Sequence, residues 1–190
     1  MGVESVGSDV LLMERDVSFE DSLLGDSVDR IRKQIDCDTI AVDAQPLDAL
    51  ETVTLVTIRG PYDPLKVRVG NAVATEAGAD LQFRYPLDER QSAEERQQLE
   101  AYHDDLLDLC DVPTERTFVD RQKLSAAIDA ADSDRTLLIR ANNGGLSART
   151  SNDNGSTQSA IQDSNHRSME VDTKTHPGGV VGRLLERLAF

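Results

Sequence analysis

Two pairs of adjacent glycines have the residue type and the position that anion binding requires. Gly144 and Gly145 follow a short apolar run, and Gly178 and Gly179 come directly before an amphipathic stretch. Glycine lets the backbone approach phosphate oxygens closely, and the N-terminus of a helix presents unsatisfied N–H groups with a partial positive charge. The sequence therefore predicts an anion site at these glycines. The alternative is that they only form turns and begin a helix.

Two arginines and one serine could complete such a site. Arg59 and Arg140 lie at the ends of two apolar runs, where each could add positive charge. Ser156, in the stretch NGSTQS, resembles a Gly-Ser phosphate motif, although the polar residues around it are typical of a loop.

The side chains that usually carry catalysis or bind metals are not arranged for either purpose. His103, His166 and His176 lack the spacing of metal ligands. Cys37 and Cys110 are far apart, which predicts two buried free thiols. We find no Ser-His-Asp or Cys-His pattern, so the sequence predicts a protein that is not an enzyme. It also predicts no metal and no resident cofactor, with ATP or AMP as the alternative ligand.

The charge of the chain limits the classes of partner. Its 35 acidic and 20 basic residues give a net charge of −15, and the acidic residues are spread along the sequence. Such a surface repels phosphate backbones and anionic lipids, so we expect no nucleic acid partner. No apolar run approaches the length that spans a bilayer, so we expect no membrane insertion of these residues and a cytoplasmic location. The composition is typical of a halophilic archaeon, and an ordinary acidic cytosolic protein is the alternative.

Short apolar runs alternate with helical patterns along the chain. The runs are mostly continuous, which is typical of strands in a parallel sheet covered on both faces. They span residues 9–13, 38–43, 52–58, 79–85, 116–120 and 135–141. The sequence therefore predicts an α/β fold, with an open parallel sheet and helices on both of its faces.

Two of the helical patterns carry clear signals at their ends. The pattern over residues 63–77 is followed by Gly78, which predicts a C-cap. Ser92 is followed three residues later by Glu95, the spacing of a capping box. Further amphipathic patterns cover residues 23–35, 120–132 and 178–190.

The beginning and the end of the chain resemble each other. Residues 9–16 are similar to residues 135–142, and residues 25–35 align without gaps on residues 178–188. We therefore expect residues 1–45 to be the closing strand–helix–strand unit of one copy of a repeated domain.

Residues 51–190 would then form a second copy that lacks its last strand. Within it, residues 146–176 are rich in Ser, Thr, Asn, Asp and Gln and have little periodicity. This stretch predicts a long, mobile polar loop.

The arrangement resembles the universal stress protein family, whose members have an open parallel sheet of five strands with helices on both faces. TVTLVTIRGPYDPLKVRVGNAVATEAGADLQFRY is similar to the family's first strand, loop, helix and second strand. SDRTLLIRANNGG resembles the fourth strand with its glycine-rich loop, and PGGVVGRLLERL resembles the helix that follows. LLGDSVDRI is the most family-like piece of the preceding copy.

The resemblance implies a phosphate-binding loop that has degenerated. Nucleotide-binding members have a Gly-x-x-Gly turn after the fourth strand, a spacer, and then Gly-Ser or Gly-Thr at the start of a helix. They also have an acidic residue at the tip of the first strand. Here Arg59 stands where the acidic residue is expected, Gly144 and Gly145 are adjacent, and Gly178-Gly179 is not followed by a hydroxyl residue.

The resemblance therefore implies a non-catalytic regulatory or interaction domain. The family assembles edge to edge through the fifth strand, which residues 38–43 would supply here with an unpaired edge. This implies a homodimer, or docking to the rest of a longer chain. Tandem copies occur as cytosolic tails of archaeal amino-acid permeases and antiporters, which implies a role in amino acid transport. One alternative is a stress protein that binds ATP or AMP. Another is an enzyme on a similar scaffold, whose Ser-Gly-Gly-x-Asp-Ser signature we do not find.

Overall fold

In the computed structural model, the described residues are 10–15, 31, 34, 35, 37–43, 49–57, 63–87, 91–141 and 166–173. Their helices and strands follow one another in the order β1 (Val10–Arg15), β2 (Asp38–Asp43), β3 (Thr52–Val56), α2 (Asp63–Ala77), β4 (Asp80–Leu87), α3 (Ala93–Leu107), β5 (Thr114–Asp120), the 3-10 turn η2 (Arg121–Lys123), α4 (Leu124–Asp129), β6 (Thr136–Ala141) and β7 (Arg167–Asp172).

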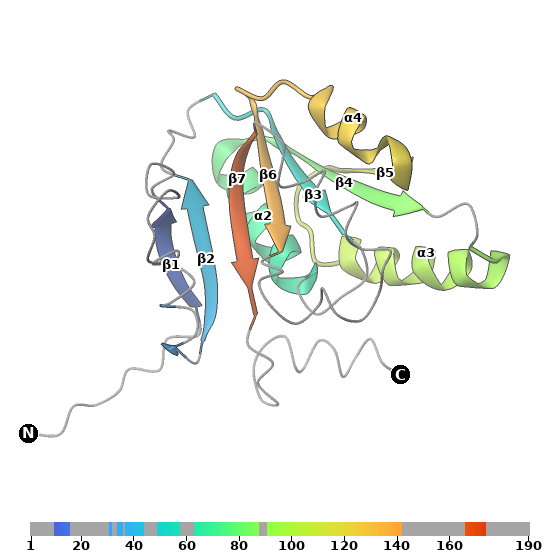
Figure 1. Ribbon diagram of the computed structural model, residues 1–190, viewed down its shortest axis with the longest axis horizontal. Coiled ribbons are helices and arrows are strands. Elements are labelled where there is room, and N and C mark those ends of the chain that lie inside the picture. The colour runs from blue at the N-terminus through green and yellow to red at the C-terminus, as the bar shows by residue number, and fades with distance from the viewer. Residues whose placement is uncertain are drawn as a thin grey trace, which may run out of the picture.

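The described strands form one seven-stranded sheet in the order β1-β2-β7-β6-β3-β4-β5 (Figure 1). Five neighbouring strands, from β7 to β5, run parallel to one another. β1 and β2 also run parallel, but β2 meets β7 in the antiparallel direction. The predicted α/β fold with a parallel five-stranded sheet is confirmed, and two further strands extend that sheet.

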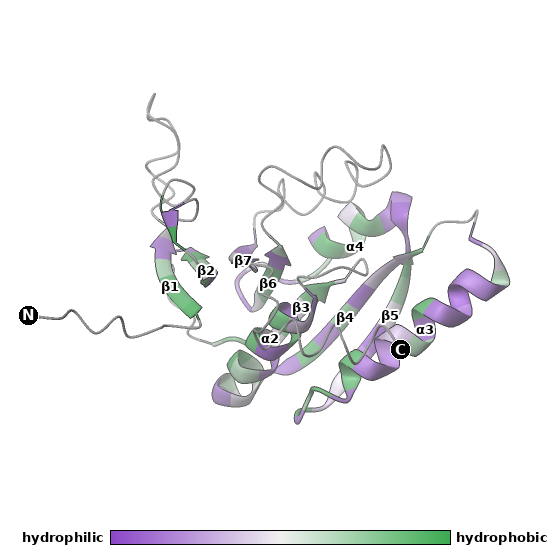
Figure 2. Cartoon of the chain, turned by 90° about the horizontal axis from the view of Figure 1, so that it is seen from below, coloured by the Kyte–Doolittle hydropathy of each residue, from purple (hydrophilic) through white to green (hydrophobic). Residues whose placement is uncertain are grey.

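Helices cover both faces of the sheet, α2 and α3 on one face and α4 on the other (Figure 2). On the first face, side chains of α2 and α3 pack on those of β3, β4, β6 and β7: Leu65, Val67 and Leu106 on Leu55, Leu81, Ile139 and Val171. On the second face, side chains of α4 pack on those of β3, β5 and β6: Leu124 and Ile128 on Val56, Val119 and Leu138. Successive residues of the inner strands are therefore buried on opposite faces, which explains their continuous apolar runs.

Both predicted helix ends are confirmed. Gly78 follows α2 with a φ of 65°, a left-handed conformation that glycine adopts without strain. At the start of α3, the Glu95 backbone N–H donates to Ser92 Oγ, and the Ser92 backbone N–H donates to the Glu95 carboxylate. These local signals fix the end of α2 and the start of α3, the two helices that cover the larger core.

Strand β7 lies in residues that the sequence predicted to be a loop. It pairs in parallel with β6, with Leu137 opposite Arg167 and Ala141 opposite Val171. The prediction of a mobile loop over residues 146–176 is therefore wrong for residues 167–172, and residues 146–165 and 174–176 lie outside the described residues. The expectation that the second copy lacks its last strand is also wrong, because β7 occupies the place beside β6.

The polar residues of β7 prevent its prediction from the sequence, because the groups that they bind are distant in sequence. Met169 and Val171 are buried in the larger core. Between them, Glu170 pairs with Arg140 of β6, with 3.3 Å between the charged atoms. The backbone N–H and hydroxyl of Ser168 both donate to Asp43 of β2, at 2.9 and 2.7 Å. Each polar group is thus satisfied by a neighbouring strand, which no local pattern reveals.

The position of β7 corrects two further expectations. Residues 178–190 cannot directly follow the fourth strand β6, since β7 intervenes, and they lie outside the described residues. The strand of residues 38–43 has no unpaired edge, because β2 lies between β1 and β7. The predicted assembly through that edge is therefore not available.

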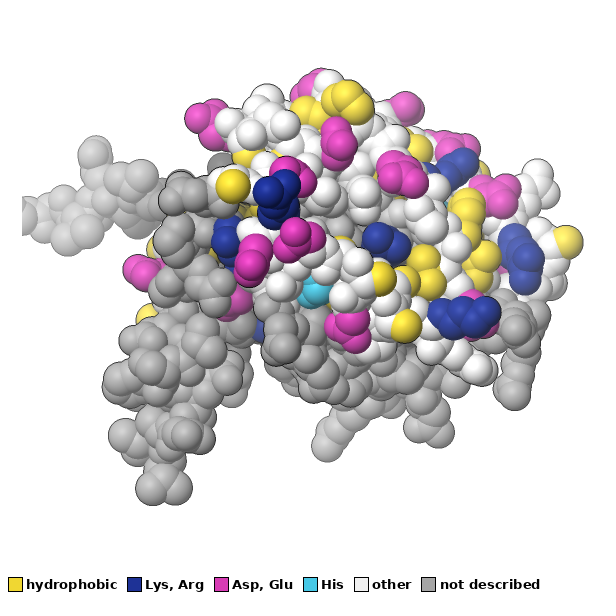
Figure 3. Space-filling model, turned by 90° about the horizontal axis from the view of Figure 1, so that it is seen from above, with side chains coloured by type: hydrophobic (Ala, Val, Ile, Leu, Met, Phe, Trp, Pro, Cys, Tyr) yellow, Lys and Arg dark blue, Asp and Glu magenta, His cyan; other side chains and the backbone are white. Residues whose placement is uncertain are grey.

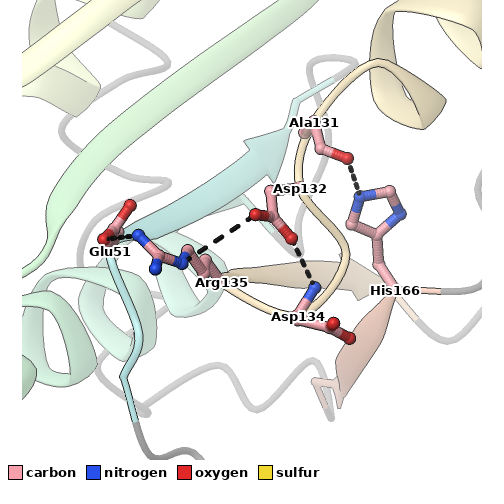
Figure 4. Close-up of polar contacts among 6 residues, drawn as sticks. All are labelled: Glu51, Ala131, Asp132, Asp134, Arg135 and His166. Atoms are coloured by element: carbon pink, nitrogen blue, oxygen red, sulfur yellow. Dashed lines mark hydrogen bonds and ion pairs between the residues drawn. The ribbon is translucent and has the colours of Figure 1, made fainter.

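Polar contacts hold the edge at which β3, β6 and β7 begin (Figure 4). Arg135, just before β6, forms an ion pair with Glu51, just before β3. Arg135 also lies 3.9 Å from the Asp132 carboxylate. His166, just before β7, contacts the carbonyl oxygen of Ala131 at 3.3 Å through its Nε2 atom. These contacts tie the turn after α4 to three strands.

The packing of α2 on the sheet is tight at Gly70. A Cβ atom there would lie 3.0 Å from Leu55 Cδ2 and 3.3 Å from Leu81 Cδ1. We expect Gly70→Val to lower the free energy of unfolding by about 1–3 kcal/mol, measured by denaturant titration, because the larger side chain overpacks this contact. Ala72→Val, on the exposed face of the same helix, should cost only about 0.5 kcal/mol. Equal losses in the two variants would contradict the close approach of α2 to β3 and β4.

Candidate functional site

The candidate site is the edge of the sheet at which the parallel strands end. β3 and β6 are parallel neighbours there, but the chain leaves β3 toward β4 on one side and β6 toward β7 on the other. Open α/β sheets commonly bind ligands at such a divergence.

The five residues predicted to bind an anion all follow strands that end at this edge. Arg59 follows β3, Gly144 and Gly145 follow β6, and Gly178 and Gly179 follow β7. All five lie outside the described residues, so the anion site itself stays a prediction. What the structure does show is that the strands before these residues are consecutive neighbours in the order β7-β6-β3.

A buried ion pair lies at the end of β3, in the first turn of α2. Lys66 Nζ is 2.6 Å from Asp63 Oδ1 and donates a hydrogen bond of 2.6 Å to the carbonyl oxygen of Val56, the last residue of β3. The Tyr102 hydroxyl, from α3, donates to Asp63 Oδ2 at 3.1 Å. Lys66 and Asp63 are only 2% and 1% exposed.

This arrangement fixes the charge of Lys66 inside the protein. Its ammonium group is matched by a carboxylate at 2.6 Å and satisfies a strand carbonyl, and the carboxylate lies at the N-terminal turn of α2, where negative charge is favourable. A cation that is neutralised and buried in this way attracts a passing anion weakly. Lys66 therefore provides no free positive charge for an anion at the end of β3.

The positive charge of Arg140 is also neutralised by a carboxylate. Arg140 was predicted as a source of positive charge for the anion site, but its guanidinium lies 3.3 Å from the Glu170 carboxylate, and both side chains are 12% exposed. Its charge is therefore matched within the pair of strands β6 and β7.

Aromatic side chains fill the space beside the ion pair, between α3 and the strands β4 and β5. The ring of Tyr85 stacks on that of His103, with 17° between their planes, and Phe118 lies at an angle to both. The guanidinium of Arg116 lies 5.4 Å from the centre of the Phe118 ring. Tyr85 and His103 are fully buried.

Burial favours the neutral forms of His103, Tyr85 and the nearby Cys110. It lowers the pKa of His103 to about 3, and the positive charge of Arg116 adds to that effect. Burial also raises the pKa of the Tyr85 hydroxyl, and it raises that of the Cys110 thiol to about 11, with a smaller contribution from Asp111. A neutral histidine of this pKa and a protonated thiol are poor as a general base and a nucleophile at neutral pH.

Within the described part of the chain, no group of three or more His, Cys, Asp or Glu side chains is placed to hold a metal ion. Cys37 and Cys110 are both free thiols, as the sequence predicted, but they are half-buried and not fully buried. None of the described helices is both long and apolar enough to cross a membrane.

Sequence reasoning missed the buried pair of Asp63 and Lys66. The available signal was the spacing of three residues at the start of a helix, together with the scarcity of lysine in this acidic chain. Pairs with that spacing usually lie on the exposed surface of a helix, so the spacing by itself does not predict burial.

Acidic side chains are dispersed over one face of the described surface, as their spread along the sequence suggested. Figure 3 shows Asp and Glu distributed across the visible face, with Lys and Arg between them. No large basic patch is visible on that part of the described surface.

Comparisons with known proteins show the fold. A universal stress protein from Archaeoglobus fulgidus DSM 4304 has a TM-score of 0.54 at 12% identity, and the match covers 86% of this chain and 61% of that one. A universal stress protein from Archaeoglobus fulgidus has a TM-score of 0.50 at 12% identity, covering 64% of this chain and 93% of the other. The chain thus has the fold of universal stress proteins, although it spans less than two thirds of the first of these structures.

A third similar structure is the universal stress protein from Archaeoglobus fulgidus in complex with dAMP. It has a TM-score of 0.49 at 13% identity, and the match covers 65% of this chain and 98% of that one. No protein-family model and no curated protein matches the sequence.

Lys66→Met tests the buried ion pair. The substitution should lower the free energy of unfolding by about 3–5 kcal/mol, because it leaves the Asp63 carboxylate buried without its counterion. The double variant Asp63→Asn/Lys66→Met removes both charges and should recover most of that loss. Asp104→Asn, which breaks the more exposed pair with Arg116, should cost at most about 1 kcal/mol. Denaturant titrations would contradict the buried pair if Lys66→Met cost no more than Asp104→Asn.

His103 should make the stability depend on pH below neutrality. The unfolded chain binds a proton at this residue near its usual pKa of 6.5, whereas the folded chain does so only near pH 3. The contribution of His103 is therefore fully present above pH 6.5 and is lost as the pH falls, by up to about 1.4 kcal/mol per pH unit. Denaturant titrations of His103→Phe, which fills the same space without a titrating group, should show a smaller slope. Identical slopes in the two proteins would contradict a neutral, buried His103.

Proposed function

We propose that this chain is a non-catalytic regulatory and interaction module with the universal stress protein fold, in which a complete five-stranded unit is joined to the last two strands of a second unit. The observation that carries the proposal is the antiparallel pairing of β2 with β7. It joins two parallel strand pairs, β1–β2 and β6–β7, into one continuous sheet.

The two strand pairs correspond in sequence as well as in geometry. The similarity of residues 9–16 to residues 135–142 places Val10 on Thr136 and Arg15 on Ala141, which are the bounds of β1 and β6. β2 and β7 each have six residues and each end in aspartate. The 86% coverage in the longer match exceeds what residues 51–190 alone would give, so it includes part of the first fifty residues. These observations support a tandem arrangement.

The charges at the candidate site favour an interaction module over a nucleotide-binding enzyme. Lys66 and Arg140 are both matched by carboxylates of this chain. His103 and Cys110 are held neutral. Lys66 and Arg140 therefore offer no free positive charge to a polyphosphate, and His103 and Cys110 are not activated for turnover. We propose that the module acts in the cytoplasm by binding another protein surface.

A more specific proposal is that the module is attached to an amino-acid permease or antiporter. It rests on the family resemblance, in which tandem copies form the cytosolic tails of such transporters. The hydropathy of the sequence on either side of these 190 residues in the intact protein tests it directly. Apolar segments of about 20 residues there would support a transporter, and their absence would favour a free-standing tandem protein.

Nucleotide binding is the second candidate, and the position of β7 favours it. Residues 142–165 must connect β6 to β7, the place where nucleotide-binding members of the resembled family have their glycine motif. In this sequence Gly145 is followed, after nine residues, by Gly155 and Ser156. This Gly-Ser pair, rather than Gly178-Gly179, has the matching place in the chain.

Thermal unfolding in the presence of ATP, ADP and AMP, with Mg²⁺ and in molar KCl, distinguishes the two candidates. An interaction module should show no shift of the midpoint. A nucleotide-binding module should gain about 2.7 kcal/mol when the ligand is at 100 times its dissociation constant, which corresponds to several degrees for a chain of this length. Such a shift, abolished by Ser156→Ala and retained by Ser125→Ala on α4, would overturn the proposal in favour of the second candidate.

A further inference from the structure

The outer edge of β1 has the features of an unprotected sheet edge. No described strand lies beyond β1 in the sheet (Figure 1). Its sequence, VLLMER, has four consecutive apolar residues and contains neither proline nor lysine, which commonly protect edges. Leu12 is 66% exposed and Val10 is 41% exposed. Such an edge presents backbone N–H and C=O groups together with apolar side chains.

The corresponding strand of the complete unit shows what β1 lacks. Leu138 of β6 corresponds to Leu12 and is 1% exposed, because it packs against α4, and β6 also pairs in parallel with β3 on that side. β1 has neither cover among the described elements. The same type of side chain at the same strand position is therefore buried in one unit and exposed in the other.

The opposite edge of the sheet is better protected. β5 follows Pro113 and carries the charged, exposed residues Glu115 and Arg116 near its start. Charges and proline at an edge disfavour pairing with another strand. Of the two outer edges of the described sheet, β1 is thus the one suited to pair with a strand from outside.

We propose that β1 pairs antiparallel with β1 of a second copy of this chain, with Leu12 at the two-fold axis. With a two-fold axis perpendicular to the sheet, each face of one copy continues as the same face of the second copy. Residues that lie opposite each other must then point to the same face, so the sum of their numbers must be even. Centring on Leu12 places it opposite Leu12 of the second copy and places Leu11 opposite Met13. Leu12 and the pair of Leu11 with Met13 then have apolar partners, and Val10 lies opposite Glu14. A shift that centres on Met13 would keep a single apolar pair, because Leu12 would lie opposite Glu14 and Leu11 opposite Arg15.

A second copy fits this edge better than the other strands that the chain offers. Pairing β1 with β5 of another copy would bring apolar residues against Glu115 and Arg116, and it would propagate head to tail instead of closing. The chain already uses antiparallel pairing where its two strand pairs meet, with Ile40 opposite Val171 and Val42 opposite Met169. The dimer would therefore be one continuous sheet through both copies.

The oligomeric state of the full chain tests this dimer. Sedimentation or light scattering in molar KCl, which screens repulsion between copies that each carry a net charge of −15, should give twice the mass of the 20.8 kDa chain. Leu12→Lys should raise the dissociation constant of the dimer at least about tenfold, because like charges would face each other at the axis. The matched change at the other edge, Phe118→Lys, should leave the dimer intact. Circular dichroism checks that both variants are folded.

Leu12→Cys tests the register. In an antiparallel pair the two Cα atoms at the axis lie about 4.5–5.5 Å apart, within the range that a disulfide bridges. Oxidation should therefore link two copies through this residue, beyond any background from Cys37 and Cys110 in the unsubstituted chain. A monomer at about 100 µM, or a dimer unaffected by Leu12→Lys, would overturn the proposal. So would cross-linking through Phe118→Cys with none through Leu12→Cys.

Discussion

The antiparallel contact between β2 and β7 is the interaction on which the rest of this structure depends. A two-stranded ribbon such as β1–β2 is marginal by itself in water, so it needs the sheet of the larger unit beside it. Side chains fasten both ends of the contact: Asp43 accepts two hydrogen bonds from Ser168, and Asp38 accepts one of 2.9 Å from Thr173. Because β7 is also the parallel neighbour of β6, this one strand connects the pair β1–β2 to the strands β6, β3, β4 and β5.

The edge at which the strands end shows why the fold alone does not decide the ligand. Universal stress protein structures share this sheet, yet here the end of β3 is closed by Lys66 and Asp63, and the Arg140 guanidinium is matched by Glu170. Function in such folds depends on the residues at the strand ends. In this chain the described cations Lys66 and Arg140 are neutralised by carboxylates of the same chain, so the shared fold does not imply a shared ligand.

Local patterns predicted much of the fold but little of the site. The apolar runs of β3 and β6, Gly78 and the Ser92–Glu95 capping box each depend on neighbours in sequence, and each was found correctly. β7 was missed because its polar residues are satisfied by β2 and β6, far away in the chain. The Asp63–Lys66 pair was missed because its spacing does not indicate burial. The five predicted anion-binding residues stay a prediction.

The contact of β2 with β7 also determines where the sheet can grow. In an isolated five-stranded unit, β7 would itself be an edge strand, and the backbone N–H and C=O groups that now pair with β2 would face water. By pairing with β7 inside one chain, β2 removes that edge and moves the boundary of the sheet outward to β1. A complete second unit would place an equivalent of β3 beside β1, as β3 lies beside β6. Leu12 is exposed because no described strand or helix covers β1, whereas the corresponding Leu138 is covered by α4 and has β3 beside it.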